Sequence, residues 1–307
     1  MKKEKLVIIG SGPAGLTAAL YSARARLEPL VVSGTQLGGQ ISITNEVENY
    51  PGFPQGTTGP ELVELMRKQA EVFGARLQID EVTKVDFSSG PPFTVETHSE
   101  NYEAEAVIVT AGASPKRLGV PGEDEFIGRG VSFCATCDGF FFREKDVVVV
   151  GGGDSAMEEG IFLTKFANRV DVLHRRDELR AGEALKRRAF SNEKLGFIWD
   201  TVLEEIVGNG KVQAIRTRNV KTGDIETRET DGVFIFIGHY PNSSLFEGQL
   251  EMDEAGYLTV DKKMMTSVPG VFAAGEIMDS VYRQIATSVG QGTAASMMTE
   301  RWLETQE

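Results

Sequence analysis

The sequence predicts an α/β protein with two doubly wound domains, the second inserted into the first. Two glycine-rich turns, each between an apolar strand and a helix, carry this prediction. Gly10-Ser-Gly12-Pro-Ala-Gly15 follows the apolar run 5–9, and Gly151-Gly-Gly153-Asp-Ser-Ala156 follows the run Asp146-Val-Val-Val-Val150. The length of 307 residues allows two domains of ordinary size. We therefore expect two Rossmann-like units, each with a three-layer ββα arrangement.

The remaining elements follow from apolar patterning. A continuous apolar run such as 146–150 is typical of a parallel strand buried on both faces. The other expected elements, in chain order, are a helix at 17–25, strands at 29–32 and 106–112, a helix at 157–166, and strands at 169–173 and 232–238.

Two candidate linkers lie at 113–117 and 239–242, each directly after an expected strand that ends in small residues. The simplest division places residues 1–115 and 243–307 in one domain and residues 116–242 in the other. The two nucleotide-binding units form the internal repeat of the chain.

Composition restricts the class of protein. The chain is 41% hydrophobic and 25% charged, which is typical of a globular protein, and its 34 glycines suit repeated tight turns. A net charge of −13 argues against nucleic acid or an anionic membrane surface as the main partner. The apolar run near the start is too short for a signal peptide, and no run is long enough to span a bilayer. We expect a cytoplasmic protein.

The first glycine turn predicts a nucleotide site. Gly10 permits the tight turn, Gly12 lets a pyrophosphate approach the backbone, and Gly15 allows the helix to pack closely on the strand. Ser33 stands where an acidic residue usually binds the adenosine ribose, so this site does not suit NAD.

The second glycine turn predicts an NADP(H) site. The strand after it ends in His174-Arg175-Arg176, and Arg180 follows. An acidic residue here favours a free ribose 2′-hydroxyl, whereas arginines bind a 2′-phosphate through charge-assisted bonds. The alternative is a solvated basic face, and we assign the neighbouring group at 186–188 to the surface.

The only two cysteines form Cys134-Ala-Thr-Cys137, with Asp138 directly after. This spacing permits a disulfide that opens and closes, and the carboxyl group is placed to move the protons of thiol–disulfide exchange. A structural zinc site would need further ligands from His98, His174 and His239, which lie in scattered segments. Inert disulfides are rare in the cytoplasm. A redox-active pair is favoured, and no metal site is expected.

Taken together, these motifs resemble those of the low-molecular-weight thioredoxin reductases, which are flavoprotein disulfide reductases. The resemblance runs nearly end to end. The segments that carry it are 10–15, 38–40, 46–52, 134–139, 151–156, 174–176, 238–242, 270–275 and 282–284.

The resemblance implies FAD on the outer domain and NADPH on the inserted one. The residues implied for FAD are Gly10, Gly12, Pro13, Ala14, Gly15, Gly39, Gln40, Asn49, Gly112, Gly275, Glu276, Arg283, Gln284 and Ile285. Those implied for NADPH are Gly151, Gly153, Asp154, Ser155, Ala156, His174, Arg175, Arg176 and Arg180. FAD binding without a ribose acid also accounts for Ser33.

The resemblance further implies a reaction. A hydride would pass from NADPH to the flavin, which would reduce the disulfide, and the dithiol would reduce thioredoxin or a similar small redox protein. Cys137 would be the sulfur near the flavin, Cys134 would attack the partner, and Asp138 would be the general acid and base. Rotation of the inserted domain at the two linkers and a homodimer are also implied.

Three positions depart from the family pattern. Glu276 replaces the usual Asp, Gln36 lies near a position often held by Glu, and Tyr240 replaces a small residue. Two alternatives stay open: a flavin reductase with another protein partner or electron donor, and a non-catalytic module that senses NADP(H) or redox state. A ferredoxin–NADP-type flavoprotein would lack the cysteine pair.

Overall fold

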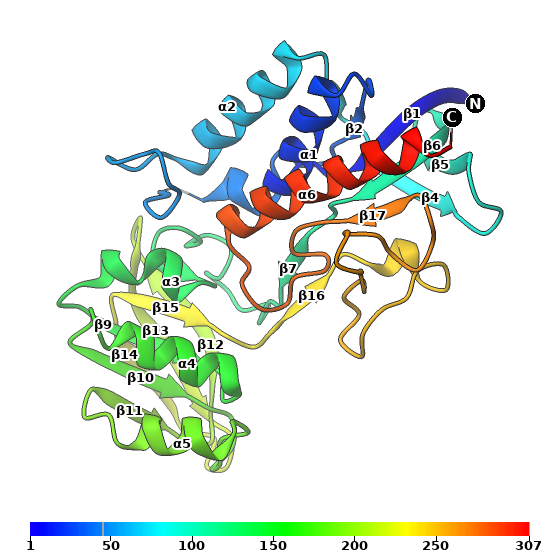
Figure 1. Ribbon diagram of the computed structural model, residues 1–307. Helices are drawn as coiled ribbons and strands as arrows, with labels where there is room; N and C mark the ends of the chain where they lie inside the picture. The colour runs from blue at the N-terminus through cyan, green and yellow to red at the C-terminus, as the bar shows by residue number, and fades with distance from the viewer. Residues whose placement is uncertain (45, 307) are drawn as a thin grey trace. The chain divides into compact units, whose positions relative to one another are not determined.

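The computed structural model describes residues 1–44 and 46–306, and the chain folds into two compact units (Figure 1). The first, here called the outer unit, comprises Met1–Ser114 and Tyr240–Glu307. The second, here called the inserted unit, comprises Pro115–His239. Each is described by itself.

The outer unit is built on a mixed sheet. Its path runs β3-β2-β1-β6-β5-β4, and β17 also pairs with β6. The first four strands on that path and β17 are parallel, whereas β4, β5 and β6 form antiparallel pairs. The strands are β1 (Lys2–Ile9), β2 (Leu30–Val32), β3 (Arg76–Gln78), β4 (Val82–Asp86), β5 (Phe93–Thr97), β6 (Asn101–Val109) and β17 (Val271–Ala273).

Strand β1 shows why the sheet is buried on both faces. Side chains alternate across a strand, and Val7 and Ile9 pack in one hydrophobic cluster while Leu6 and Ile8 pack in another. The second cluster includes the small residues of helix α1, which packs on α6. The helices of this unit are α1 (Pro13–Arg24), α2 (Gly59–Val72), α6 (Ile285–Glu304), and the short 3₁₀ segments η1 (Gly39–Ile43) and η3 (Ser244–Phe246).

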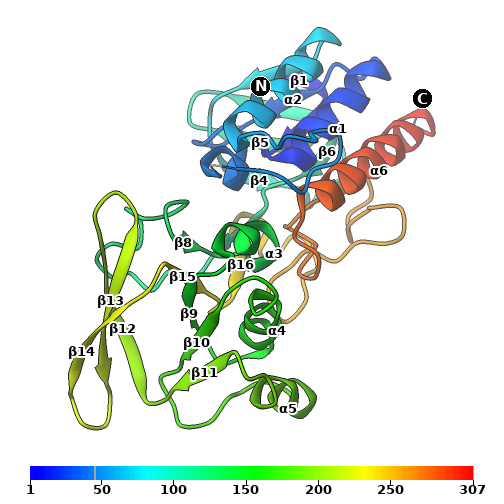
Figure 2. The ribbon, with the colours of Figure 1, turned by 90° about the vertical axis from the view of Figure 1, so that its left-hand side faces the viewer.

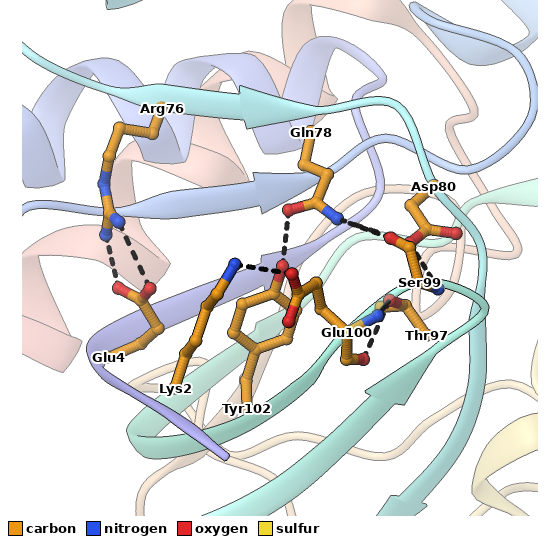
Figure 3. A network of polar contacts seen from close by, with 9 residues as sticks. All are labelled: Lys2, Glu4, Arg76, Gln78, Asp80, Thr97, Ser99, Glu100 and Tyr102. Carbon is orange, nitrogen blue, oxygen red and sulfur yellow. Dashed lines mark hydrogen bonds and ion pairs between the residues drawn. The ribbon is translucent and has the colours of Figure 1, made fainter.

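A network of polar side chains joins strands β1, β3 and β6 (Figure 3). The ring of Tyr102 is buried in the core, yet its hydroxyl donates a hydrogen bond to the side-chain oxygen of Gln78. The other pairs in the network include Arg76 with Glu4, Lys2 with Glu100, and Ser99 with Asp80. These bonds fix the register of strands that are far apart in sequence, and they serve the sheet rather than a reaction.

The inserted unit is a three-layer domain. Its parallel sheet has the order β11-β10-β9-β15-β8, and a separate antiparallel sheet has the order β12-β13-β14 (Figure 2). The parallel strands are β8 (Val131–Ser132), β9 (Asp146–Val150), β10 (Arg169–Leu173), β11 (Leu195–Ile198) and β15 (Gly232–Ile235). The antiparallel strands are β12 (Thr201–Gly208), β13 (Val212–Asn219) and β14 (Ile225–Glu229). The helices are α3 (Ala135–Asp138), α4 (Asp154–Leu163), α5 (Glu183–Phe190) and the 3₁₀ segment η2 (Gly139–Phe142).

The alternation of valines in β9 explains these layers. Val147 and Val149 pack with the residues of α4 and α5, whereas Val148 and Val150 pack with apolar residues of β12 and β13. Helices, parallel sheet and antiparallel sheet therefore form the ββα arrangement that the sequence predicts. A second β layer was thus expected, but apolar patterning did not locate its strands.

The segments expected to be linkers contain two short strands. β7 (Ala113–Pro115) and β16 (His239–Pro241) pair with each other where the chain passes between the units. The strands that precede them end earlier than expected, at Val109 and at Ile235. Among the described residues, no helix is long and apolar enough to cross a membrane.

Candidate active site and cofactor sites

The first glycine turn joins β1 to α1 in the outer unit. Gly12 is the N-cap of α1, and Pro13 occupies the first helical turn, where its missing N–H costs nothing. Ser11 fixes the turn, because its hydroxyl donates to the carbonyl of Ser33 at 3.0 Å and accepts the N–H of Gly38 at 3.0 Å. The turn therefore presents the N-terminus of α1 with its backbone N–H groups free of a side-chain cap.

Space around the glycines separates packing from binding. A Cβ atom on Gly10 would lie 2.4 Å from the carbonyl oxygen of Thr110, and one on Gly15 would lie 2.1 Å from that of Gly10. A Cβ atom on Gly12 would meet nothing within 4 Å. Gly10 and Gly15 are required by close packing, whereas Gly12 faces open space at a helix N-terminus, which fits a phosphate group.

The other residues predicted for FAD lie in the outer unit, several of them beside this turn. β1, β6 and β17 are parallel and end at Ile9, Val109 and Ala273, so the segments after them meet at one edge of the sheet. Gly275 approaches α1 so closely that a Cβ atom would lie 2.9 Å from the Cβ of Ala14. Gly39 and Gln40 lie in η1, with Gly39 beside Gly12, and Gly112 follows β6. Asn49 donates a hydrogen bond to Gln284 at 3.2 Å. Arg283 has a φ of 48°, and Ile285 begins α6.

Glu276 lies in a mostly buried position after β17. Burial raises the pKa of its carboxyl group to about 7, with Arg283 opposing the rise and Asp279 adding to it. The neighbouring loop is held by two residues that sequence reasoning missed. Gln291 accepts the N–H of Gly275 at 3.0 Å and donates to Asp279 at 3.1 Å. Asp279 also accepts the N–H groups of residues 281 and 282.

The second glycine turn joins β9 to α4 in the inserted unit and repeats the same division of roles. A Cβ atom on Gly151 would lie 2.5 Å from the carbonyl oxygen of Phe236, and one on Gly152 would lie 2.3 Å from the ring of His174. A Cβ atom on Gly153, the N-cap of α4, would meet nothing within 4 Å. Asp154, Ser155 and Ala156 form the first turn of the helix. This site also fits a phosphate.

The predicted NADPH residues after β10 lie beside this turn. The N–H of Arg180 donates to the carbonyl of Gly152 at 2.7 Å, which fixes the loop 175–180. Arg175, Arg176 and Arg180 line a shallow hollow. His174 is 4% exposed, and its Nε2 has no hydrogen-bond partner among the described residues. Burial lowers the pKa of this imidazole, and the three arginines lower it further. The structure thus brings the four basic residues together with the second glycine turn.

Cys134 and Cys137 form a disulfide at the start of α3, in the inserted unit. Both cysteine residues are only partly buried. The N–H of Cys137 donates to the sulfur of Cys134 at 3.2 Å, and the hydroxyl of Ser132 accepts the N–H of Cys134 at 3.1 Å. Since the sulfurs are bonded to each other, neither offers a thiolate ligand to a metal.

Two carboxyl groups flank the disulfide. Burial raises the pKa of Asp138, and a hydrogen bond with Ser132 opposes the rise. Glu159 of α4 accepts the N–H of Ala135 at 2.8 Å. Sequence reasoning found Asp138 by its position after Cys137 but missed Ser132 and Glu159. Asp138 is therefore suited to hold a proton at a higher pH than an ordinary carboxyl group.

Comparisons with known proteins agree with this geometry. The family model described as pyridine nucleotide-disulphide oxidoreductase matches residues 4–292. The chain is 52% identical over 303 residues to a thioredoxin reductase of Mycolicibacterium smegmatis, covering 98% of this chain and 97% of that protein. It is 50% identical over 300 residues to one of Streptomyces coelicolor, covering 97% and 93%.

A solved structure gives the same result. The crystal structure of thioredoxin reductase from Streptococcus pyogenes is 45% identical, covers 99% of each chain and has a TM-score of 0.94. The chain therefore belongs to the pyridine nucleotide-disulphide oxidoreductase family and, within it, to the low-molecular-weight thioredoxin reductases.

Proposed function

We propose that this protein uses NADPH to reduce the disulfide of thioredoxin or of a similar small redox protein, with FAD as its bound cofactor. The disulfide between Cys134 and Cys137 carries the proposal, because it is partly exposed and lies beside a carboxyl group with a raised pKa. The named relatives are thioredoxin reductases, which supports the same substrate class.

The cofactor assignment follows from the two glycine turns. The outer unit offers an open helix N-terminus at Gly12 and no acidic residue at Ser33, which suits the pyrophosphate of FAD. The inserted unit offers an open helix N-terminus at Gly153 beside Arg175 and Arg176, which suits the diphosphate and 2′-phosphate of NADPH. We therefore assign FAD to the outer unit and NADPH to the inserted unit. The residues predicted above would hold each group.

Bound FAD would supply the chemistry that accepts a hydride from NADPH and delivers two electrons to a disulfide. The protein's own residues perform the exchange with the partner. The thiolate of Cys134 attacks one sulfur of the partner's disulfide, and that disulfide breaks as a mixed disulfide forms. Cys137 then attacks Cys134, which reforms the internal disulfide and releases the second partner thiolate. Two electrons pass from the dithiol to the partner.

Asp138 supplies the proton in this cycle. A carboxyl group whose pKa is raised by burial is protonated over a wider range of pH than an ordinary Asp. It protonates a leaving thiolate when the disulfide opens and takes a proton from a thiol when the disulfide reforms. We further propose a homodimer that works in the cytoplasm, and a turnover that requires the inserted unit to rotate at the paired segments β7 and β16.

One experiment tests the main proposal. The purified protein is expected to be yellow, and anaerobic NADPH should bleach the flavin absorbance at least tenfold faster than NADH at equal concentration. Cys134→Ser and Cys137→Ser should retain this bleaching but lose reduction of oxidised thioredoxin. Asp138→Asn should retain the flavin spectrum and slow thioredoxin reduction on the order of 100-fold.

The alternatives predict different results. A reductase for another partner would bleach with NADPH and fail with thioredoxin at every concentration. A non-catalytic sensor would bind NADPH without turnover of any disulfide. A colourless protein, or a preference for NADH, would contradict the cofactor assignment itself.

A further inference from the structure

The loop 175–180, here called the arginine loop, contains opposing charges that work against anion binding. It carries Arg175, Arg176 and Arg180, but Asp177 and Glu178 lie between them. A carboxylate this close to an arginine would pair with it and would also repel a phosphate. The sequence of the loop alone therefore leaves the strength of the site undecided.

Lysines from two other elements bind these carboxylates. The Nζ of Lys221, in the turn between β13 and β14, lies 2.8 Å from Asp177 and 3.0 Å from Asp200. The Nζ of Lys186, on α5, lies 3.2 Å from Glu178. Lys221 offsets the negative charge of Asp177, and its hydrogen bond lowers the pKa of that carboxyl group, so Asp177 stays ionised and paired with the lysine.

The three arginines are left available as a result. Among the residues that the structure describes, no carboxylate lies within ion-pair distance of Arg175, Arg176 or Arg180. Both Lys221 and Asp177 line the same hollow as these arginines. The backbone supports this arrangement, because the N–H of Asp200 donates to the carbonyl of Arg176 at 3.2 Å and that of Val220 to the carbonyl of Asp200 at 2.6 Å.

We propose that Lys221 is a specificity-determining positioning residue, which holds Asp177 away from the arginines and so keeps the arginine loop selective for a ribose 2′-phosphate. This inference rests on the proposed NADPH site and adds a residue to it. Lys186, which also pairs with Glu183 at 3.1 Å, binds Glu178 in the same way. Neither lysine is adjacent to the arginines in sequence, so the motif His174-Arg175-Arg176 does not contain this determinant.

The test compares two probes that differ only in the ribose 2′-phosphate. Adenosine 2′,5′-bisphosphate carries the 2′-phosphate and adenosine 5′-monophosphate lacks it, and calorimetry measures the affinity of the holoenzyme for each. Wild type should prefer the bisphosphate. In Lys221→Ala, affinity for the bisphosphate should fall about three- to tenfold, while affinity for the monophosphate should change less than twofold. Lys211→Ala, which removes an exposed lysine of the same unit, should change neither.

A second variant separates positioning from direct contact. If Lys221 acts by restraining Asp177, then Lys221→Ala with Asp177→Asn should regain bisphosphate affinity to within about twofold of wild type. If the double variant stays as weak as Lys221→Ala, Lys221 contacts the phosphate itself and the proposal is wrong. An equal loss for both probes, or no loss, would also overturn it. Failure of the NADPH assignment is a distinct result, because wild type would then show no preference for the bisphosphate.

Discussion

At the scale of single residues, the site depends on carboxyl groups in unusual surroundings. Asp138 and Glu276 are both mostly buried, and burial raises the pKa of each. Burial penalises the charged form of a carboxyl group, so each holds its proton to a higher pH than in the unfolded chain. For Asp138 this suits the proton transfer proposed above. For Glu276 it has a consequence for stability that can be measured.

The first prediction concerns Glu276→Gln. The folded pKa of about 7 exceeds the ordinary value of 4.5, so the folded state binds more protons between these values. The stability contributed by protonated Glu276 is therefore fully present below about pH 4.5 and is lost as pH rises through 7. The variant should match wild type near pH 4.5 and exceed it by about 3 kcal/mol above pH 7. Urea unfolding of flavin-free protein across this range measures the difference.

Glu254→Gln is the matched control, because Glu254 is an exposed residue of the same unit. It should change the free energy of unfolding by less than about 0.5 kcal/mol at every pH. A constant difference between Glu276→Gln and wild type across the pH range would show that packing, and not ionisation, distinguishes the two side chains.

Prediction of single residues from sequence needs no tertiary structure where one motif contains all the candidate residues. Cys134, Cys137 and Asp138 are neighbours in sequence, so their proximity in space needs no fold. Glu159 accepts the N–H of Ala135, 24 positions away, and Lys221 donates to Asp177, 44 positions away, at 2.8 Å in each case. A single sequence holds no signal for such pairs, because each looks like an ordinary surface charge on a helix or in a turn.

At the scale of elements, the two glycine turns show how one local geometry is used twice. In each turn, some glycines are required because a side chain would collide with a neighbouring group, and one glycine faces open space. The first kind comprises Gly10, Gly15, Gly151 and Gly152. Gly12 and Gly153 are the open positions. Packing and ligand binding therefore place separate demands on neighbouring residues of the same turn.

The second prediction uses this difference between Gly15→Ala and Gly12→Ala. The new methyl group at Gly15 would lie 2.1 Å from the carbonyl oxygen of Gly10, so α1 must move and stability should fall by about 2–3 kcal/mol. Gly12 has a φ of −65°, which any residue adopts, so its variant should lose less than about 1 kcal/mol. Gly12→Ala should nevertheless bind FAD at least tenfold more weakly, because the methyl group occupies the approach of the pyrophosphate.

Thermal unfolding and the flavin retained on purification distinguish the two effects. Gly15→Ala should show a lowered melting temperature even without flavin. A Gly12→Ala protein that binds FAD as tightly as wild type would contradict the assignment of this turn to a phosphate.

Elements were predictable where apolar patterning was strong. The expected strands at 146–150 and 169–173 agree with β9 and β10 to the residue. Helices α1 and α4 begin at Pro13 and Asp154, earlier than expected, because the glycine motif itself supplies the N-cap. The strands of the antiparallel sheet were not located, because strands such as β14 are largely exposed and carry too few apolar residues for a clear alternation.

At the scale of the whole molecule, the insertion of one domain into another depends on two paired segments. The N–H of Lys116 donates to the carbonyl of Gly238 at 2.9 Å, so the two ends of the inserted unit lie together. In the outer unit, the N–H of Asn242 donates to the carbonyl of Gly112 at 3.0 Å, and the side chain of Asn242 accepts the hydroxyl of Ser114 at 3.0 Å. Hydrogen bonds thus join the two chain segments of each unit where they meet the other unit's sequence.

The third prediction is that each unit folds alone. Each has its own hydrophobic clusters, and each closes its ends by backbone hydrogen bonds. Residues 115–239 should unfold cooperatively, keep the internal disulfide and bind adenosine 2′,5′-bisphosphate but not FAD. Residues 1–114 joined to 240–307 by a short glycine linker should bind FAD but not the bisphosphate. Calorimetry of both fragments measures unfolding and ligand binding. The division would be refuted if the inserted unit showed no cooperative transition, or if one fragment bound both ligands. Mixing the fragments should not restore thioredoxin reduction, since without the covalent junction any electron exchange between the units depends on the encounter of two separate chains.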